Sequence, residues 1–160
     1  GDCIGGMMLA HVSSAQAMVA AKNAIMGDTE RYSNKTTPSC VYLDPELAVV
    51  GLTEEQARKQ YTNVKVGKYD LSMNAKVMLM GKDGIIKFVT EGYTGKVLGL
   101  HILGPRASDM IQEGALALAM DANIDDIINT IHAHPTIAEG IYEAAQDVPQ
   151  NAIFLLCQDR

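Results

Sequence analysis

Apolar positions along the chain change their spacing twice, which divides it into an initial helix, a block of strands and a C-terminal group of helices. After a glycine-rich opening, apolar residues recur at helical spacing, and Gly27-Asp28 is expected to end this first helix. Its many alanines predict close packing against a neighbouring element. The polar residues 28–37 then predict a connecting segment. The apolar positions of the helix are Leu9, Val12, Ala15, Met18, Val19 and Ile25.

The middle of the chain has the pattern of short β-strands. Asp83-Gly84 and Thr94-Gly95 predict tight turns between the last three of them. Strands joined by such short turns are antiparallel, because a parallel return needs a connection of about a dozen residues or more. The strands are expected at residues 39–43, 47–50, 64–71, 75–80, 85–91 and 97–103.

Helical spacing returns after Gly104-Pro105. It predicts a helix over about 107–121 that ends at Asn123, a short helix with isoleucines on one face, and a last helix over about 136–147. The inward positions are expected to be Met110, Ile111, Leu118, Ala119, Ile124, Ile127, Ile128 and Ile131. Within the strand block, Thr53 and Gln56 form a capping box that starts a helix ending near Gln60.

Strands grouped together and helices grouped together predict an α+β fold, an antiparallel β-sheet meander covered by helices. The composition agrees with a folded domain, since 48% of the 160 residues are hydrophobic and 20% are charged. The net charge of −6 and the absence of tryptophan argue against a nucleic-acid partner. No apolar run approaches the roughly 18–20 residues that cross a bilayer, so no membrane partner is expected.

The three cysteines, Cys3, Cys40 and Cys157, are far apart in the sequence and form neither a CxxC nor a CxxxxC pair. This spacing favours a reducing compartment, and each cysteine is expected to be a small buried apolar residue. The chain opens on Gly1 without a signal-peptide pattern, which predicts a processed protein or a piece of a longer one.

Two interpretations of the His134-Pro135 region remain open from the residues alone. Proline disfavours helical backbone for the residue before it, so His134 is expected to lie just ahead of the last helix, with Glu139 in its first turn. Thr136 and Glu139 have the spacing of a capping box. Alternatively, Glu139 holds the His134 ring in one tautomer and orientation, as the acid of a catalytic triad does.

The remaining histidines do not indicate a metal site. His132 and His134 are two residues apart in an extended segment, so their rings point to opposite faces, and His101 falls within a strand. At the other end of the chain, Asp2 and Gly5-Gly6 precede a helix whose N-terminus attracts negative charge. A plain acidic loop is the alternative there. Neither GxGxxG nor GxxxxGK[ST] occurs in the chain.

Four blocks of sequence resemble the flavin-dependent disulfide oxidoreductases, in particular the dihydrolipoamide dehydrogenase branch of that family. They occur in the family's order and cover nearly all of residues 1–147. The blocks are GDCIGGMMLAH at 1–11, PSCVYLDPELAVVGLTEEQA at 38–57, GKVLGLHILGPRASDMI at 95–111 and HAHPTIAE at 132–139.

The resemblance implies a domain division and a partial cofactor site. Residues 1–30 correspond to the end of an FAD-binding domain, 31–37 to a linker, 38–147 to the interface domain of a homodimer and 148–160 to a tail. Asp2 matches the aspartate that binds the ribitol of FAD. A helix N-terminus beside the flavin is implied for Met8, Leu9, Ala10 and His11.

The resemblance also implies a catalytic pair. His134 matches the acid/base histidine, which reaches the active site of the other subunit, and Glu139 matches the glutamate that orients it. The parent enzyme would oxidise dihydrolipoamide, carried by a lipoyl-bearing protein, with FAD and NAD, in the cytoplasm or the mitochondrial matrix. Because a carboxylate is not expected to serve both partners fully, the histidine is favoured over the cap as the partner of Glu139.

Departures from the family pattern limit what this chain is expected to do. The redox CxxxxC and the nicotinamide domain are absent, Met7 replaces a usual proline, and Asp109 replaces a usual glutamate. The chain alone is therefore expected to be inactive and not to retain FAD. Two alternatives stay open, namely a fragment of a glutathione-type disulfide reductase and a stand-alone dimerisation module without redox function.

Overall fold

The computed structural model describes residues 1–149, which form two compact units. The first unit is Gly1–Thr37, and the second begins at Pro38. Within residues 1–149, no helix is both long and apolar enough to span a bilayer. The predicted apolar cluster at residues 153–156 and Cys157 lie outside the described residues.

The first unit contains a short 3₁₀ helix, η1 (Asp2–Ile4), and the long helix α1 (Ala10–Met26). Leu9 is extended and begins α1, and Gly27, with φ 84°, ends it, as the sequence predicts. Helix α1 is mostly exposed within the described residues, so its predicted close packing stays a prediction. Val12 is its only buried residue, whereas Met18 and Ile25 are 73% and 84% exposed.

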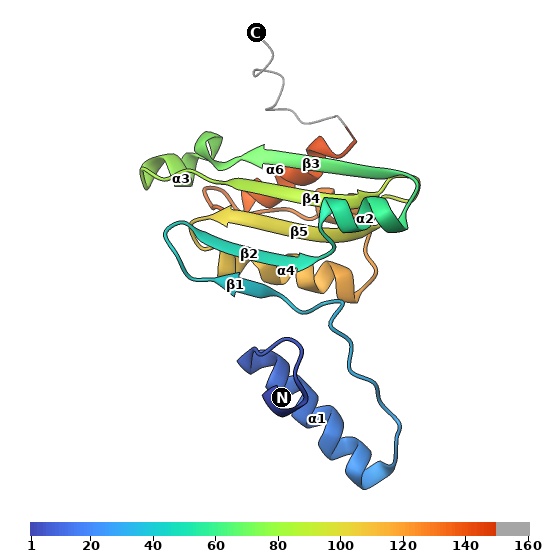
Figure 1. Ribbon diagram of the computed structural model, residues 1–160. Coiled ribbons are helices and arrows are strands. Elements are labelled where there is room, and N and C mark those ends of the chain that lie inside the picture. Colours follow the sequence, from blue (N-terminus) through green and yellow to red (C-terminus); the bar gives the residue numbers. More distant parts are fainter. Residues whose placement is uncertain (150–160) are drawn as a thin grey trace. The chain divides into compact units, whose positions relative to one another are not determined.

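The second unit is built on a five-stranded antiparallel sheet, so the predicted α+β class is confirmed (Figure 1). The strands are β1 (Ser39–Val41), β2 (Glu46–Gly51), β3 (Val64–Asp70), β4 (Ile85–Glu91) and β5 (Val97–Gly104). Their order is β1-β2-β5-β4-β3. The sheet is therefore a β1–β2 hairpin joined to a β3–β4–β5 meander, because β2 pairs with β5 rather than with β3.

Two helices cover one face of this sheet (Figure 1). Helix α4 (Ala107–Ala119) packs on β2 and β5, and α6 (Glu139–Asp147) packs on β3 and β4. The side chains between helices and sheet are fully buried and include Leu71, Ile86, Phe88, Leu100, Ile102, Ile111 and Ile141. Gly67 permits the close approach of α6, since a Cβ at this position would lie 2.2 Å from the carbonyl oxygen of Ala144.

The opposite face carries a smaller cluster under α2 (Glu54–Gln60). Phe88 and Val89 alternate along β4, so Val89 faces away from α4 and α6 and packs with Ala57 and Leu98. The predicted capping box of α2 is present: the Thr53 hydroxyl accepts from the Gln56 N–H at 3.2 Å, and the Gln56 side chain accepts from the Thr53 N–H at 3.0 Å.

The predicted strand at 75–80 is wrong, because these residues form a helix, α3 (Ala75–Leu79), that follows a short 3₁₀ helix, η2 (Leu71–Met73). The side-chain oxygen of Asn74 accepts hydrogen bonds from the backbone N–H groups of Lys76 and Val77 and thereby starts α3. Strand β4 consequently pairs with β3 rather than with a strand at 75–80.

Asn123 does not end α4 but begins the next helix, α5 (Ile124–Ile128), with a capping box that it forms with Asp126. The backbone turns instead at Asp121, whose φ is 51°. Ile124 and Ile127 are buried as predicted, whereas Ile131 is 97% exposed and Ala119 is exposed as well.

The last helix begins at Glu139, later than predicted. It ends at Asp147, as predicted, and the next residue, Val148, is buried against the core. Cys3 is exposed, contrary to expectation, because the short first unit has no core around it, and Cys40 is half-buried on β1.

Candidate functional site

His134 and Glu139 are in direct contact. Nδ1 of His134 lies 2.8 Å from Oε1 of Glu139. His134 belongs to the segment between α5 and α6, and its side chain is 73% exposed, whereas Glu139 is the first residue of α6 and its side chain is 25% exposed. The His134–Pro135 peptide bond is cis. An exposed imidazole is thus held at one nitrogen by a half-buried carboxylate.

Glu139 also binds the backbone, so the two sequence interpretations of this residue are compatible. Its second oxygen, Oε2, accepts from the Thr136 N–H at 2.8 Å. The expectation that the carboxylate would serve only one partner well is therefore wrong, since each oxygen has its own donor. The reciprocal half of a capping box is missing, because the Thr136 hydroxyl donates to the Ala133 carbonyl at 2.6 Å and α6 begins without a side-chain cap.

These contacts set the charge of Glu139. Partial burial by itself would raise the pKa of the carboxyl group, but the hydrogen bonds from the Thr136 N–H and from His134 outweigh burial and lower it. A carboxylate that stays ionised and accepts from Nδ1 fixes the His134 tautomer that carries its proton on Nδ1. The lone pair of His134 is then on Nε2, at the exposed end of the ring.

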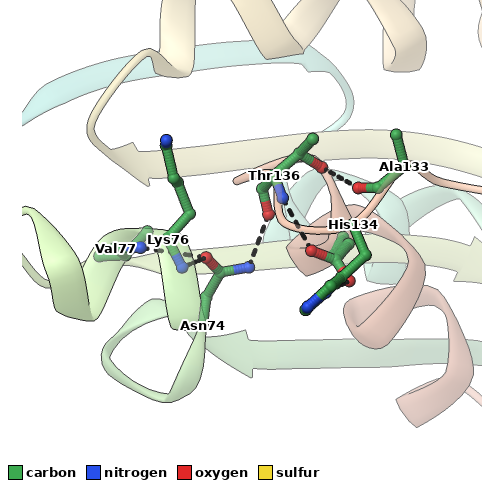
Figure 2. Close-up of polar contacts among 7 residues, drawn as sticks. Asn74, Lys76, Val77, Ala133, His134 and Thr136 are labelled. Carbon is green, nitrogen blue, oxygen red and sulfur yellow. Dashed lines mark hydrogen bonds and ion pairs between the residues drawn. The ribbon is translucent and has the colours of Figure 1, made fainter.

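A hydrogen bond from Asn74 also joins the segment that carries His134 to the start of α3. The Asn74 amide nitrogen donates to the Thr136 carbonyl at 3.0 Å, while the Asn74 oxygen caps α3 (Figure 2). Asn74 is 4% exposed, so its bonds are shielded from water. Asn74 was not among the predicted site residues, because residues 75–80 were predicted to be a strand rather than a helix that an asparagine could cap. An asparagine directly ahead of a run without glycine or proline was the available signal.

Both ring nitrogens of His132 form hydrogen bonds. Nδ1 lies 2.9 Å from the Thr130 carbonyl oxygen, and Nε2 lies 3.0 Å from Oε1 of Glu113 on α4. Its side chain is 8% exposed, and its ring centre lies 6.0 Å from that of Tyr142. His132 and His134 therefore have different carboxylate partners. In residues 1–149, no group of three or more histidine, cysteine, aspartate or glutamate side chains has the arrangement of a metal site.

A second carboxyl group lies one helical turn beyond Glu139. Glu143 is 8% exposed, and its Oε2 is buried without a hydrogen-bond partner among the described residues. Burial raises the pKa of Glu143, and the charge of Glu139 adds to this effect. Burial also raises the pKa of Tyr69 to about 12, with the nearby charges of Glu143 and Glu139 contributing. Glu143 is thus kept neutral more easily than an ordinary glutamate.

The first unit brings together the other predicted site residues. Asp2 lies in η1, and its Oδ1 accepts from the Ser13 hydroxyl of α1 at 3.0 Å. Met8 is 64% exposed, Ala10 and His11 are exposed in the first turn of α1, and Leu9 begins the helix. The N-terminus of α1 has no side-chain cap and no acidic residue in its first turn.

Residues 37–145 match the model of the pyridine nucleotide-disulphide oxidoreductase dimerisation domain. The chain belongs to this family. Similar curated proteins include the dihydrolipoyl dehydrogenases of Thermus scotoductus, 43% identical over 98% of this chain, and of Bacillus subtilis, 40% identical over 96%. The mitochondrial dihydrolipoyl dehydrogenase of Pisum sativum is 39% identical over 91%. The aligned parts make up 34%, 32% and 29% of these relatives, so the chain spans about a third of their length.

Solved structures show the same fold. LpdA from Mycobacterium tuberculosis superposes with a TM-score of 0.84 and 26% identity, covering 91% of this chain and 32% of that one. The flavoprotein disulfide reductase RclA from Escherichia coli superposes with a TM-score of 0.83 at 23% identity, over 91% of this chain and 34% of its own, which shows the fold alone. The second unit is thus a dimerisation domain, and the family's role implies self-association.

Proposed function

We propose that the second unit is the dimerisation domain of a dihydrolipoyl dehydrogenase and that it supplies His134 as the acid/base to the active site of the partner subunit. The observation that carries this proposal is the 2.8 Å contact between His134 Nδ1 and Glu139, with Glu139 itself fixed by the Thr136 N–H. Because the His134 side chain is 73% exposed, its free nitrogen is accessible to a group from outside the chain.

The chemistry follows from thiol reactivity. Only a thiolate attacks a disulfide, and an ordinary thiol with a pKa near ~8.5 is mostly protonated at neutral pH. Nε2 of His134 takes the proton of a dihydrolipoamide thiol, and the Glu139 carboxylate stabilises the resulting imidazolium. The thiolate then attacks the redox disulfide of the parent enzyme, and the sulfur that leaves carries the electron pair. A cysteine pair of the CxxxxC type is not part of this sequence.

The residues of the first unit fit one edge of an FAD site. The exposed Asp2 carboxylate suits a polyol hydroxyl, and its bond to Ser13 fixes it beside α1. Met8 and Leu9 lie directly ahead of α1, and Ala10 and His11 are its first two residues, so all four are at the end of the helix that favours negative charge. When bound, FAD would accept the electron pair of the dithiol and pass it to NAD. Few contacts of this kind are present, so the isolated chain is proposed to be inactive and not to retain FAD.

The remaining assignments form part of the same proposal. Residues 1–30 are the end of an FAD domain, 31–37 a linker, 38–147 the surface of a homodimer and 148–160 a tail. The parent enzyme acts on a lipoyl-bearing protein in the cytoplasm or the mitochondrial matrix.

Replacing His134 by glutamine in the full-length parent enzyme tests the proposal. Loss of a positioned base lowers turnover of dihydrolipoamide by about 10² to 10⁴-fold. The variant keeps the domain fold, because the His134 side chain is largely exposed. Turnover equal to that of the wild type would refute the catalytic role of His134.

A further inference from the structure

The two ring nitrogens of His132 both face hydrogen-bond acceptors. The Thr130 carbonyl oxygen can only accept, and the Glu113 carboxylate accepts at Nε2. A neutral imidazole has one N–H and would leave one acceptor facing a lone pair. The side chain is 8% exposed, so the ring depends mainly on these two protein groups for its hydrogen bonds. With Glu113 as a carboxylate, the doubly protonated imidazolium satisfies both acceptors at once.

The groups around His132 favour this cation. His132 lines one cavity of about 270 Å³ with Glu139, Tyr142 and Glu143, and another of about 520 Å³ with Glu113 and Asp126. These charged and titratable neighbours come from α4, α5 and α6, and among residues 1–149 no lysine or arginine lines either cavity. The pKa of His132 is raised, chiefly by the hydrogen bond with Glu113, which outweighs the opposing effect of burial.

The hydrogen bond between His132 and Glu113 is important for His134 because His132 lies only two residues ahead of it. Ile131, directly ahead of His132, is 97% exposed, whereas Thr136 is fixed to Asn74 and to Glu139 on the far side of His134. On the near side, the Ala133 carbonyl accepts from the Thr136 hydroxyl, and the side chain of His132 adds a bond to a different helix. It ties the segment to α4, two residues ahead of His134.

We propose that His132 is a positioning residue. As an imidazolium hydrogen-bonded to Thr130 and Glu113, it holds the His134 segment against α4. The inference rests on the proposed function of His134. His132 does not contact the substrate; it fixes the backbone from which His134 extends. Deprotonation of His132 at alkaline pH removes one of its two donors and loosens the segment, so His134 then spends less time in its working position.

The protonation of His132 is tested by NMR on the 160-residue chain labelled with ¹⁵N-histidine, which contains four histidines. His132 is expected to titrate at higher pH than an ordinary histidine, with both ring nitrogens protonated at pH 7. Glu113→Gln keeps an acceptor but removes the charge, so the titration of His132 moves to lower pH. Glu55→Gln, at an exposed glutamate of α2, is the control and leaves it unchanged. A neutral His132 ring at pH 7 would overturn the inference.

The positioning role is tested in the full-length parent enzyme. His132→Gln is expected to lower kcat by about 10- to 100-fold with little change in the KM for NAD, because small displacements of a catalytic group have effects of this size. Glu113→Gln moves the alkaline limb of the kcat profile to lower pH, and Glu55→Gln does not. If His134→Gln abolishes turnover but the Glu113 and His132 variants keep the wild-type kcat and pH profile, this inference fails and the proposed function stands. If His134→Gln is fully active, the proposed function itself fails.

Discussion

Oε1 of Glu139 lies 2.8 Å from Nδ1 of His134, and the remaining oxygen of the same carboxylate binds the Thr136 backbone. Glu139 thus both binds the backbone ahead of α6 and orients the His134 ring, two roles that the sequence alone presented as alternatives. The backbone bond prevents the carboxylate from rotating away, so the His134 ring is oriented by a group that is itself fixed. The tautomer with a free Nε2 follows from this contact.

Replacing Glu139 by glutamine tests the orientation of the ring. The amide can occupy the same space, but it carries no charge to stabilise the imidazolium of His134. We expect kcat of the full-length enzyme to fall by about 10- to 100-fold, less than for His134→Gln, since the base itself remains. Steady-state turnover of dihydrolipoamide measures the effect, and Glu55→Gln is the matched control. Equal losses in the Glu139 and Glu55 variants would contradict the role assigned to Glu139.

Asn74→Ala tests the link between α3 and the His134 segment. The substitution removes the cap of α3 and leaves the part-buried Thr136 carbonyl without its donor. We expect the free energy of unfolding of the chain to fall by about 2–3 kcal/mol, the sum of a cap and a part-buried hydrogen bond. Urea denaturation measures it.

Asn123→Ala is the matched control for Asn74→Ala, because Asn123 caps α5 and makes no bond to the His134 segment. The free energy of unfolding of the Asn123→Ala variant is expected to be about 1 kcal/mol lower than that of the wild type. If the two variants lose the same free energy, the bond from Asn74 to Thr136 contributes nothing beyond the cap.

Glu143 predicts a pH dependence of stability. Its pKa in the folded state is raised by burial and by Glu139, so the folded state holds this proton more tightly than the unfolded state does. The stabilisation is fully present below the ordinary glutamate pKa of about 4.3 and is lost as the pH rises through the raised folded value. Glu143→Gln removes this loss, and the variant is expected to be more stable than wild type at neutral pH.

Urea denaturation of both chains between about pH 4 and 8 checks the sign. The free energy of unfolding of the wild type should fall relative to Glu143→Gln as the pH rises. Parallel curves for the two chains would show that Glu143 has the same affinity for its proton in the folded and unfolded states.

The 160-residue chain is expected to self-associate, since its second unit belongs to a family of dimerisation domains. Sedimentation equilibrium at concentrations up to the high micromolar range is expected to show dimers. A chain that stays monomeric over the whole range would mean that the surface of residues 38–147 does not suffice for pairing.

Local signals in the sequence predicted much of the fold. The first helix and the α2 capping box depend on residues close together in the chain, and the structure confirms both. The strand predicted at 75–80 was wrong, because the strand-like composition and the following tight-turn motif were given more weight than the helix cap at Asn74. The pairing of β2 with β5 was also missed, because it joins residues about fifty positions apart and local spacing carries no such information.

In the candidate site, too, contacts between residues close in sequence were predicted and contacts between distant residues were not. His134 and Glu139 are five residues apart, so spacing and resemblance together single them out. The partner of His132 is nineteen residues away on α4, and the partner of Asn74 is sixty-two residues away. Only the packing of α3, α4 and α6 around the segment brings these groups together. Local spacing and resemblance therefore point to His134 and Glu139, whereas Asn74 and the partner of His132 become evident only in the folded structure.

A hybrid dimer of the full-length enzyme tests the central claim most directly. One subunit carries His134→Gln, the other has its redox cysteine pair replaced by serine, and two affinity tags isolate the hybrid. If His134 serves the active site of its partner, one site of the hybrid combines an intact histidine with intact cysteines, so about half of the wild-type turnover per dimer is expected. Each parental homodimer should be nearly inactive. A hybrid as inactive as both homodimers, or a His134→Gln homodimer with wild-type turnover, would contradict the account.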